Sequence, residues 1–180
     1  MENMTSNLTL ITGGAASGKS AFAERLVRTN GGQKHYLATA QAFDDEMREK
    51  VKKHQNMRGQ DWITYEEPFN PALIIANLGE NDILLLDCAT LWLTNLLLDN
   101  RDISAATSTL LAAISDSSAS IVVVTNEVGS GIVPQDALSR KFRQAQGELN
   151  QQLSAKASTV AVVISGLPMV LKGQLPDKLA

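Results

Sequence analysis

The stretch Leu8–Ser20, LTLITGGAASGKS, decides the fold of this chain. Its apolar first half predicts a buried strand over Leu8–Thr12, and the amphipathic segment after it predicts a helix over Lys19–Thr29. Between them stands the pattern G-x-x-x-x-G-K-S, whose glycines let backbone N–H groups surround a phosphate at a helix N-terminus. A glycine-rich turn without a ligand is the alternative. The pattern predicts a phosphate-binding loop made of Gly13, Gly14, Ala15, Ala16, Ser17, Gly18, Lys19 and Ser20.

Outward from this stretch, short apolar runs alternate with longer amphipathic ones, which is typical of a parallel sheet covered by helices. The expected strands are Leu8–Thr12, His35–Ala38, Trp62–Glu66, Ile83–Asp87, Ile121–Thr125 and Thr159–Ile164. The expected helices are Lys19–Thr29, Asp44–Asn56, Pro71–Leu78, Ala89–Leu98, Ser104–Ser115 and Gln135–Lys156. The last residues, GQLPDKLA, predict a loose tail. We expect one domain, residues 1–180, with a P-loop NTPase-like three-layer α/β fold and a mostly parallel sheet.

The composition excludes several classes of protein. The chain has 180 residues and a net charge of −3, so it lacks the basic field that nonspecific nucleic-acid binding requires. One cysteine and two histidines are too few for a disulfide framework or a structural zinc cluster. The apolar stretch Ile83–Leu98 is too short to span a bilayer, and the first residues do not resemble a signal peptide. We expect a cytoplasmic protein without nucleic-acid partners or membrane insertion.

A magnesium site is predicted at the end of the fourth expected strand. Four aliphatic residues precede Asp87, which places its carboxylate at the strand end where parallel sheets bind ligands. Lys19 is expected to reach the terminal phosphates of a nucleotide, and the Ser20 hydroxyl is expected to ligate Mg²⁺ together with Asp87. The alternative for Asp87 is a cap on the following helix.

His54 is the residue that could change the class of reaction. It shares a face of the expected helix with Met47 and Val51, which favours a histidine at the edge of an apolar stripe. The cations Lys52, Lys53 and Arg58 surround it in the sequence and could instead hold a phosphate beside the imidazole. From the residues alone, both interpretations stay open.

A polar loop follows the fifth expected strand. Asn126 and Glu127 could contact substrate or a water on the metal, or they could bond to their own backbone in an ordinary turn. The helix after the loop carries the polar residues Arg140, Arg143 and Asn150, and its charges are interpreted as a solvated face.

Together, several motifs resemble one family in order and spacing. They are TGGAASGKS, DDEM with His54 after it, W-x-T-x-E from Trp62 to Glu66, TNEVGSGIVP, and R-x-F-R followed by G-x-x-N-Q between Arg140 and Gln151. The chain resembles the bifunctional adenosylcobinamide kinase/adenosylcobinamide-phosphate guanylyltransferase of cobalamin biosynthesis from Leu8 to about Lys172.

The resemblance implies two reactions. A nucleoside triphosphate, ATP or GTP, phosphorylates adenosylcobinamide, and GMP from GTP is then attached to adenosylcobinamide phosphate through a guanylylated histidine, with release of pyrophosphate. By position that histidine is His54, and the resemblance also implies a homotrimer. The nucleotide contacts that it implies are Gly13–Ser20, Ala38, Thr39, Ala40, Gln55, Asn56, Met57, Arg58, Glu66 and Asp87.

The sequence departs from the family pattern at a few positions. Gln55 stands where members often have Arg or Lys, and Gly59 where they often have Pro. Asp87 and Gln144 replace a frequent Glu and Asp. Two other functions fit the phosphate-binding loop by itself: a simple kinase of a small hydroxylated metabolite, with His54 as a packing residue, and a non-catalytic nucleotide-binding module.

Overall fold

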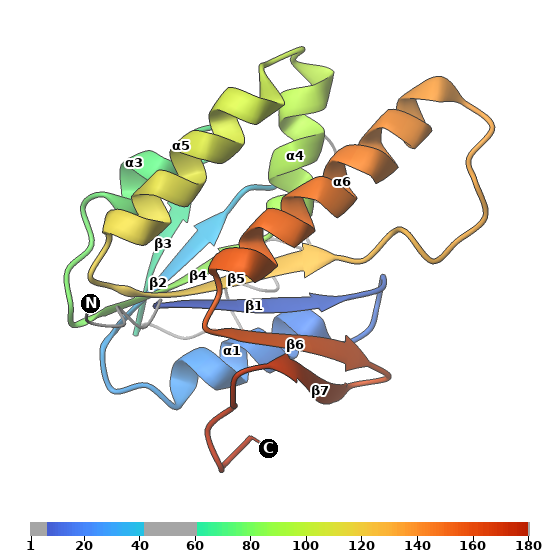
Figure 1. Ribbon diagram of the computed structural model, residues 1–180. Helices are drawn as coiled ribbons and strands as arrows, with labels where there is room; N and C mark the ends of the chain where they lie inside the picture. Colours follow the sequence, from blue (N-terminus) through green and yellow to red (C-terminus); the bar gives the residue numbers. More distant parts are fainter. Residues whose placement is uncertain (1–6, 42–60, 180) are drawn as a thin grey trace.

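A computed structural model describes residues 7–41 and 61–179, and its strands form one sheet (Figure 1). The strands are β1 (Leu8–Gly13), β2 (Gln33–Ala38), β3 (Trp62–Glu66), β4 (Asp82–Asp87), β5 (Ser120–Asn126), β6 (Thr159–Ile164) and β7 (Leu167–Lys172). Their order is β3-β2-β4-β5-β1-β6-β7, and every pair is parallel except β6–β7. The expected α/β fold with a mostly parallel sheet is confirmed.

Helices cover both faces of the sheet, as Figure 1 shows. The described helices are α1 (Lys19–Arg28), α3 (Pro71–Ile75), α4 (Ala89–Leu98), α5 (Ile103–Asp116) and α6 (Ala137–Lys156). Helices α3 to α6 lie on one face and α1 lies on the other. Their bounds agree with the sequence predictions to within two residues, except that α3 ends three residues early. The helix predicted over Asp44–Asn56 lies outside the described residues.

The two faces of the sheet bury different sets of side chains because strand residues alternate. In β1, Leu8 and Leu10 pack into the core with α4, α5 and α6, whereas Ile11 packs into the core with α1. In α1, Phe22 and Leu26 point into that second core. The alternation therefore gives the sheet a helical layer on each face. It also decides toward which face each polar side chain at a strand end points.

Strand β7 was not predicted from the sequence. The chain reverses after β6 through Ser165 and Gly166, both with positive φ (53° and 82°), and Ile164 pairs with Leu167. Two central residues with positive φ suit a two-residue hairpin turn, so the Ser-Gly pair between apolar runs was the available signal. Pro168 obscured it, because proline disfavours a central strand, but β7 is an edge strand that tolerates it.

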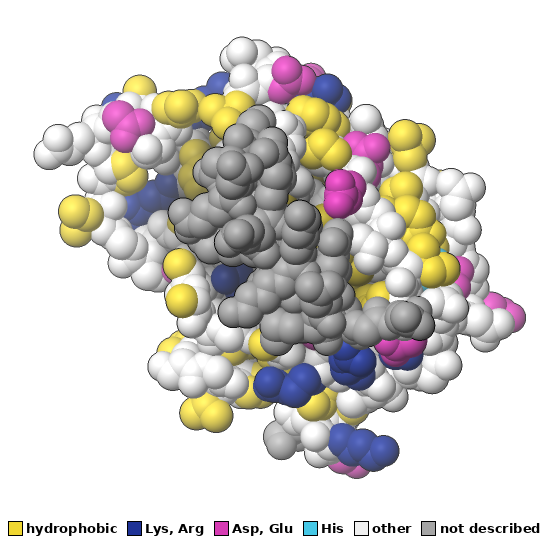
Figure 2. All heavy atoms as spheres, turned by 180° about the vertical axis from the view of Figure 1, so that it is seen from behind, with side chains coloured by type: hydrophobic (Ala, Val, Ile, Leu, Met, Phe, Trp, Pro, Cys, Tyr) yellow, Lys and Arg dark blue, Asp and Glu magenta, His cyan; other side chains and the backbone are white. Residues whose placement is uncertain are grey.

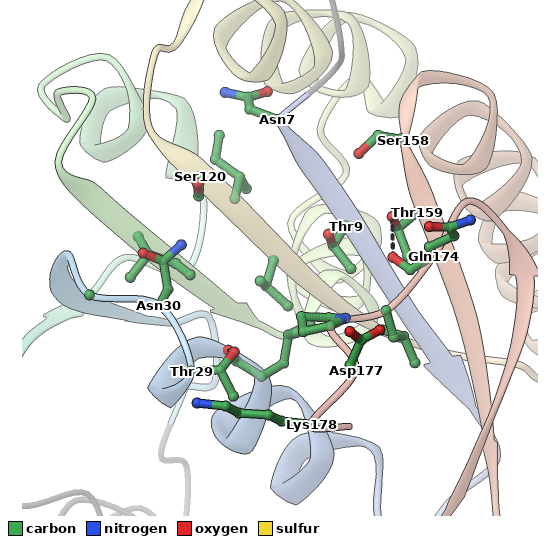
Figure 3. A pocket seen from close by; sticks show the side chains of 17 residues that line it. Asn7, Thr9, Thr29, Asn30, Ser120, Ser158, Thr159, Gln174, Asp177 and Lys178 are labelled. Atoms are coloured by element: carbon green, nitrogen blue, oxygen red, sulfur yellow. Dashed lines mark hydrogen bonds between the residues drawn. The ribbon is translucent and has the colours of Figure 1, made fainter. Parts of the chain in front are cut away.

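The prediction of a loose C-terminal tail is wrong. Leu175 is only 9% exposed and packs into the α1-side core, and Leu179 packs against the same core. Gly173 permits this path, because a Cβ there would lie 2.2 Å from the carbonyl oxygen of Ser158. The tail lines a cavity of about 770 Å³ together with Thr9 and Asn30, at the amino ends of the strands (Figure 3).

Among the described helices, none combines the length and the apolar character needed to cross a membrane.

A buried polar group links three strands at one end of the sheet. His35 on β2 is 5% exposed, and its Nδ1 lies 3.2 Å from the Tyr65 hydroxyl on β3. Its Nε2 lies 3.1 Å from Asp82 Oδ1 on β4. The backbone N–H of Gly79, and then His35, lower the pKa of Asp82 below its usual value. A carboxyl with a lowered pKa stabilises the fold above that usual value, and the stabilisation is lost as pH falls through the folded-state pKa.

We expect Asp82→Asn to lower the free energy of unfolding by about 1–2 kcal/mol at pH 7, because charge-assisted hydrogen bonds are lost. The difference from wild type should begin to shrink as pH falls below about 4 and vanish below the lowered folded-state pKa of Asp82, where the carboxyl is as neutral as the amide. Urea unfolding across this pH range measures it, with the exposed Asp99→Asn as the matched control. A difference that stays constant with pH would contradict the assignment.

Candidate nucleotide-binding site

The predicted phosphate-binding loop connects β1 to α1 at the carboxyl end of the sheet. Gly13 has no room for a side chain: a Cβ there would lie 2.5 Å from the carbonyl oxygen of Val163 and 2.7 Å from Ser17 Oγ. Gly18 precedes α1 with φ 90°, which favours glycine. Glycine is therefore required at both positions, but for different reasons. Gly13 lies too close to β6 for a side chain, and Gly18 has a left-handed backbone.

The hairpin of β6 and β7 supports this loop from the side. The N–H of Gly166 donates to the carbonyl oxygen of Ser17 at 2.8 Å. A Cβ on Gly18 would lie 3.2 Å from the Cα of Gly166, so the two backbones are in close contact. The hairpin turn, which the sequence analysis missed, thus fixes the shape of the loop.

The fold brings Ser20 to Asp87, whereas Lys19 bonds within the loop. The Ser20 hydroxyl lies 3.4 Å from Asp87 Oδ1, and Lys19 Nζ donates to the carbonyl oxygen of Gly14 at 3.0 Å. Tyr36, which the sequence analysis did not select, donates its hydroxyl to Asp87 Oδ2 at 3.2 Å. Because Tyr36 is on β2 and Asp87 on the neighbouring β4, this hydrogen bond holds the carboxylate toward α1.

The oxygen atoms of Ser20 and Asp87 fit Mg²⁺. This ion prefers hard oxygen ligands and binds through one or two protein groups, with waters and substrate phosphates completing its shell. Among the described residues no cluster of three or more His, Cys, Asp or Glu side chains could hold a metal ion. The assignment of Ser20 and Asp87 as ligands stays a prediction.

The segment after β2 has a structural function. Thr39 is fully buried, and its hydroxyl donates to the carbonyl oxygen of Cys88 at 2.7 Å and accepts from the Cys88 N–H at 3.0 Å. Asn95 donates to the carbonyl oxygen of Thr39 at 2.8 Å. Thr39 thus joins the ends of β2 and β4. Ala38 ends β2 beside Glu66, the exposed last residue of β3, and Ala40 follows.

Cys88 is a buried packing residue next to the predicted metal ligand. Burial, followed by the charge of Asp87, raises the pKa of its thiol to about 11. The thiol is therefore protonated at neutral pH and unsuited to nucleophilic attack.

The loop after β5 is tied to the phosphate-binding loop. The N–H of Glu127 donates to the carbonyl oxygen of Gly13 at 3.0 Å. Its carboxylate accepts from the backbone N–H groups of Gly129 and Ser130, as in the ordinary turn that the sequence left open. Arg140 and Arg143 donate to backbone carbonyls of the same loop. The interpretation of these charges as a solvated face was therefore incomplete, because both arginines also bind the backbone of the loop.

His54 lies outside the described residues, and so do the predicted nucleotide contacts Gln55, Asn56, Met57 and Arg58. The function of each stays a prediction from the resemblance.

Comparisons with known proteins agree with the fold and with the family resemblance of the sequence. A family model described as cobinamide kinase / cobinamide phosphate guanyltransferase matches residues 9–171. The chain belongs to this family. It is a bifunctional cobinamide kinase and cobinamide phosphate guanylyltransferase of cobalamin biosynthesis, and this membership argues against the simple kinase and the non-catalytic module.

Two relatives, each named a bifunctional adenosylcobalamin biosynthesis protein, are similar to this cobinamide kinase/guanylyltransferase over nearly all of both chains. The protein of Pseudomonas aeruginosa is 42% identical over 168 residues, which cover 92% of this chain and 97% of the relative. That of Escherichia coli K12 is 40% identical over 179 residues, which cover 91% and 98%.

Solved structures with low identity show the fold of the cobinamide kinase/guanylyltransferase alone. A protein of Pyrococcus horikoshii OT3 is 8% identical, with a TM-score of 0.57 over 98% of this chain and 91% of its own. An ATPase of a bacterial type III secretion system is 12% identical, with a TM-score of 0.50 over 91% of this chain and 56% of its own.

The two first glycines of the loop provide a matched pair of variants. We expect Gly13→Ala to lower the free energy of unfolding by about 2–4 kcal/mol and to weaken nucleotide binding, because its Cβ collides with β6. Gly14→Ala should change stability by less than about 0.5 kcal/mol, because nothing lies within 4 Å of its Cβ. Urea unfolding and nucleotide titration measure both, and equal stability of the two variants would contradict the packing argument.

Proposed function

We propose that the loop Gly13–Ser20 holds the triphosphate in the kinase reaction on adenosylcobinamide, with ATP or GTP as the donor. The proposal is carried by the approach of Ser20 to Asp87, 3.4 Å apart, beside a loop with a helix at its end. Backbone N–H groups of the loop and the α1 N-terminus stabilise negative charge on the phosphates. Lys19, now bonded to the Gly14 carbonyl within the loop, turns to the terminal phosphate when a nucleotide binds.

Magnesium, when bound through Ser20 and Asp87, supplies charge neutralisation on the phosphate oxygens. Tyr36 orients the carboxylate of Asp87. It donates a hydrogen bond to one carboxylate oxygen, and the other oxygen faces Ser20. This arrangement accounts for a carboxylate at the end of a buried strand.

The second reaction is proposed to proceed through His54. A neutral imidazole nitrogen attacks the α-phosphorus of GTP, a P–N bond forms, and the P–O bond to pyrophosphate breaks. A phosphate oxygen of adenosylcobinamide phosphate then attacks the same phosphorus, and the P–N bond breaks to release the imidazole. The products are adenosylcobinamide-GDP and pyrophosphate. Two displacements thus replace one difficult transfer, and each proceeds at a single phosphorus atom.

The chain's two histidines allow a direct test of this covalent step. We expect α-labelled GTP to leave acid-labile, alkali-stable label on the protein, and we expect His54→Ala to lose both the label and GMP transfer. Trypsin places His35 and His54 on separate peptides, because it cleaves after Lys34 and Lys53. Label on the His35 peptide, or transfer retained by His54→Ala, would contradict the proposal.

The same variants separate the two activities. His54→Ala should keep most of the phosphorylation of adenosylcobinamide, whereas Lys19→Ala should lower both activities at least about 100-fold, because a preorganised charge on the phosphates is lost. Equal loss of both activities in a folded His54→Ala protein would count against separate functions.

We also propose a homotrimer in the cytoplasm, where nucleoside triphosphates are available. Edge strand β7 exposes Leu167 (73%), Met169 (54%) and Leu171 (60%), and contiguous exposed apolar groups are typical of protein contacts. Apolar groups also reach the surface at several places in Figure 2.

Light scattering should give three times the chain mass of 19.4 kDa. The double variant Leu167→Ser/Met169→Ser should dissociate, whereas Leu73→Ser, which alters a residue of α3 that is 62% exposed, should remain trimeric. A monomeric wild type at micromolar concentration would contradict the trimer.

A further inference from the structure

The side chain of Asn126 has a buried oxygen without a partner. Among the described residues, no group donates a hydrogen bond to Asn126 Oδ1. Most buried polar atoms in proteins are satisfied, and leaving one unsatisfied destabilises the folded state. In the described part of the chain, Thr12 Oγ1, Ser17 Oγ, Trp62 Nε1 and Gln146 Oε1 share this property, so the position of Asn126 at the end of the central strand β5 decides what its oxygen can do.

The alternation of β5 shows where this side chain points. Val123 packs into the core with α4 and α6, whereas Val122 and Val124 pack into the core with α1. Thr125 points to the same side as Val123, since its hydroxyl donates to Asn150 on α6. Asn126 therefore belongs to the α1 face.

Asp87 ends β4 on that same face, since its carboxylate meets Ser20 of α1. Strand β5 lies between β4 and β1, so it separates the predicted metal ligand from the phosphate-binding loop. Asn126 pairs with Gly13 on one side, and Val124, two residues earlier, pairs with Asp87 on the other. The carboxamide thus stands between the loop and Asp87, where the phosphates are proposed to bind.

The backbone of Asn126 is fixed without help from its side chain. Its N–H donates to the Thr90 hydroxyl at 2.7 Å, and its carbonyl oxygen accepts from Asn150 Nδ2 at 3.0 Å. The fully buried Gln146 completes this network by donating to Thr125 Oγ1 at 3.0 Å. The network holds the residue in place while the carboxamide remains available.

We propose that Asn126 is a catalytic residue of the kinase reaction, whose Oδ1 accepts a hydrogen bond from the substrate hydroxyl that attacks the terminal phosphate. The unsatisfied atom is an acceptor and needs a donor. Nucleotide phosphates offer only acceptors at neutral pH, whereas the alcohol that is phosphorylated and a water on the metal both carry an O–H. We assign the alcohol, because its oxygen is the one that must be oriented for attack. This inference rests on the proposed function of the Gly13–Ser20 loop.

The amide orients the hydroxyl and takes no proton. The hydroxyl oxygen forms a bond to the γ-phosphorus, the bond from that phosphorus to the bridging oxygen breaks, and the nucleoside diphosphate leaves with the electron pair. The hydroxyl proton passes to solvent. Correct orientation of the attacking atom is a large part of catalysis in phosphoryl transfer, and a misplacement of about 1 Å costs about 100-fold in rate.

The test is Asn126→Ala in the full-length protein. We expect kcat for phosphorylation to fall about 10- to 100-fold, the nucleotide Kd to stay within about threefold, and Tm to stay equal or rise, because an unsatisfied buried oxygen is removed. GMP transfer to premade adenosylcobinamide phosphate, which uses no alcohol, should stay within about threefold.

Asn7→Ala is the matched control, an asparagine at the amino ends of the strands and away from the proposed site. It removes an amide that donates to the carbonyl oxygens of Ser117 and Ala119, so it should lower Tm while kcat of the folded protein stays within about threefold. A kcat of Asn126→Ala within twofold of wild type would overturn the proposal. Parallel loss of Tm and nucleotide binding in that variant would also overturn it, because it would indicate a structural function.

Lys19→Ala distinguishes failure of this inference from failure of the proposed site. If Lys19→Ala keeps kinase activity, the proposed function of the loop is wrong and the inference about Asn126 is overturned with it. If Lys19→Ala loses activity while Asn126→Ala keeps it, only the inference about Asn126 is wrong.

Discussion

The position of β1 between β5 and β6 is the constraint on which the rest of the structure depends. This pairing places Gly13 between Asn126 on one side and the Val163 carbonyl on the other, with no space for a Cβ. The chain can turn into α1 only through a glycine at this point. Because neighbouring strands are parallel, the same pairing brings Asp87 to the same edge of the sheet. The phosphate-binding loop and Asp87 are therefore distant in the sequence but lie close together in the fold.

Much of this arrangement could be predicted from the sequence because the signals are local. Three elements, β3, α4 and β6, have the predicted bounds, since each is a clear apolar run between turn residues. Strand β7 could not be predicted in the same way, because Pro168 argues against a central strand and only the fold makes β7 an edge. The burial of Leu175 depends equally on α1, which no pattern within the tail reveals.

The site shows the same division between local and tertiary signals. The motif identifies Lys19 and Ser20, and the end of an apolar strand identifies Asp87. The hydrogen bond from Tyr36 to Asp87 joins residues 51 apart in the sequence, and the one from Arg143 to the Ile132 carbonyl joins residues 11 apart. Such partners have no spacing rule in the sequence. Only the register of β2 and β4 and the packing of α6 bring these side chains to their partners.

The two proposed reactions require nucleophiles at different places. In the kinase reaction the substrate hydroxyl meets the terminal phosphorus, whereas in the guanylyl transfer His54 meets the α-phosphorus, and both attacks must be in line with the bond that breaks. One fixed loop cannot bring a single nucleophile to both atoms of a triphosphate held in one pose. It can hold the triphosphate while separate segments present the hydroxyl and the imidazole. The two proposals meet this requirement, because they assign the hydroxyl to Asn126 at the end of β5 and the attack on the α-phosphorus to His54, which is distant from it in the sequence.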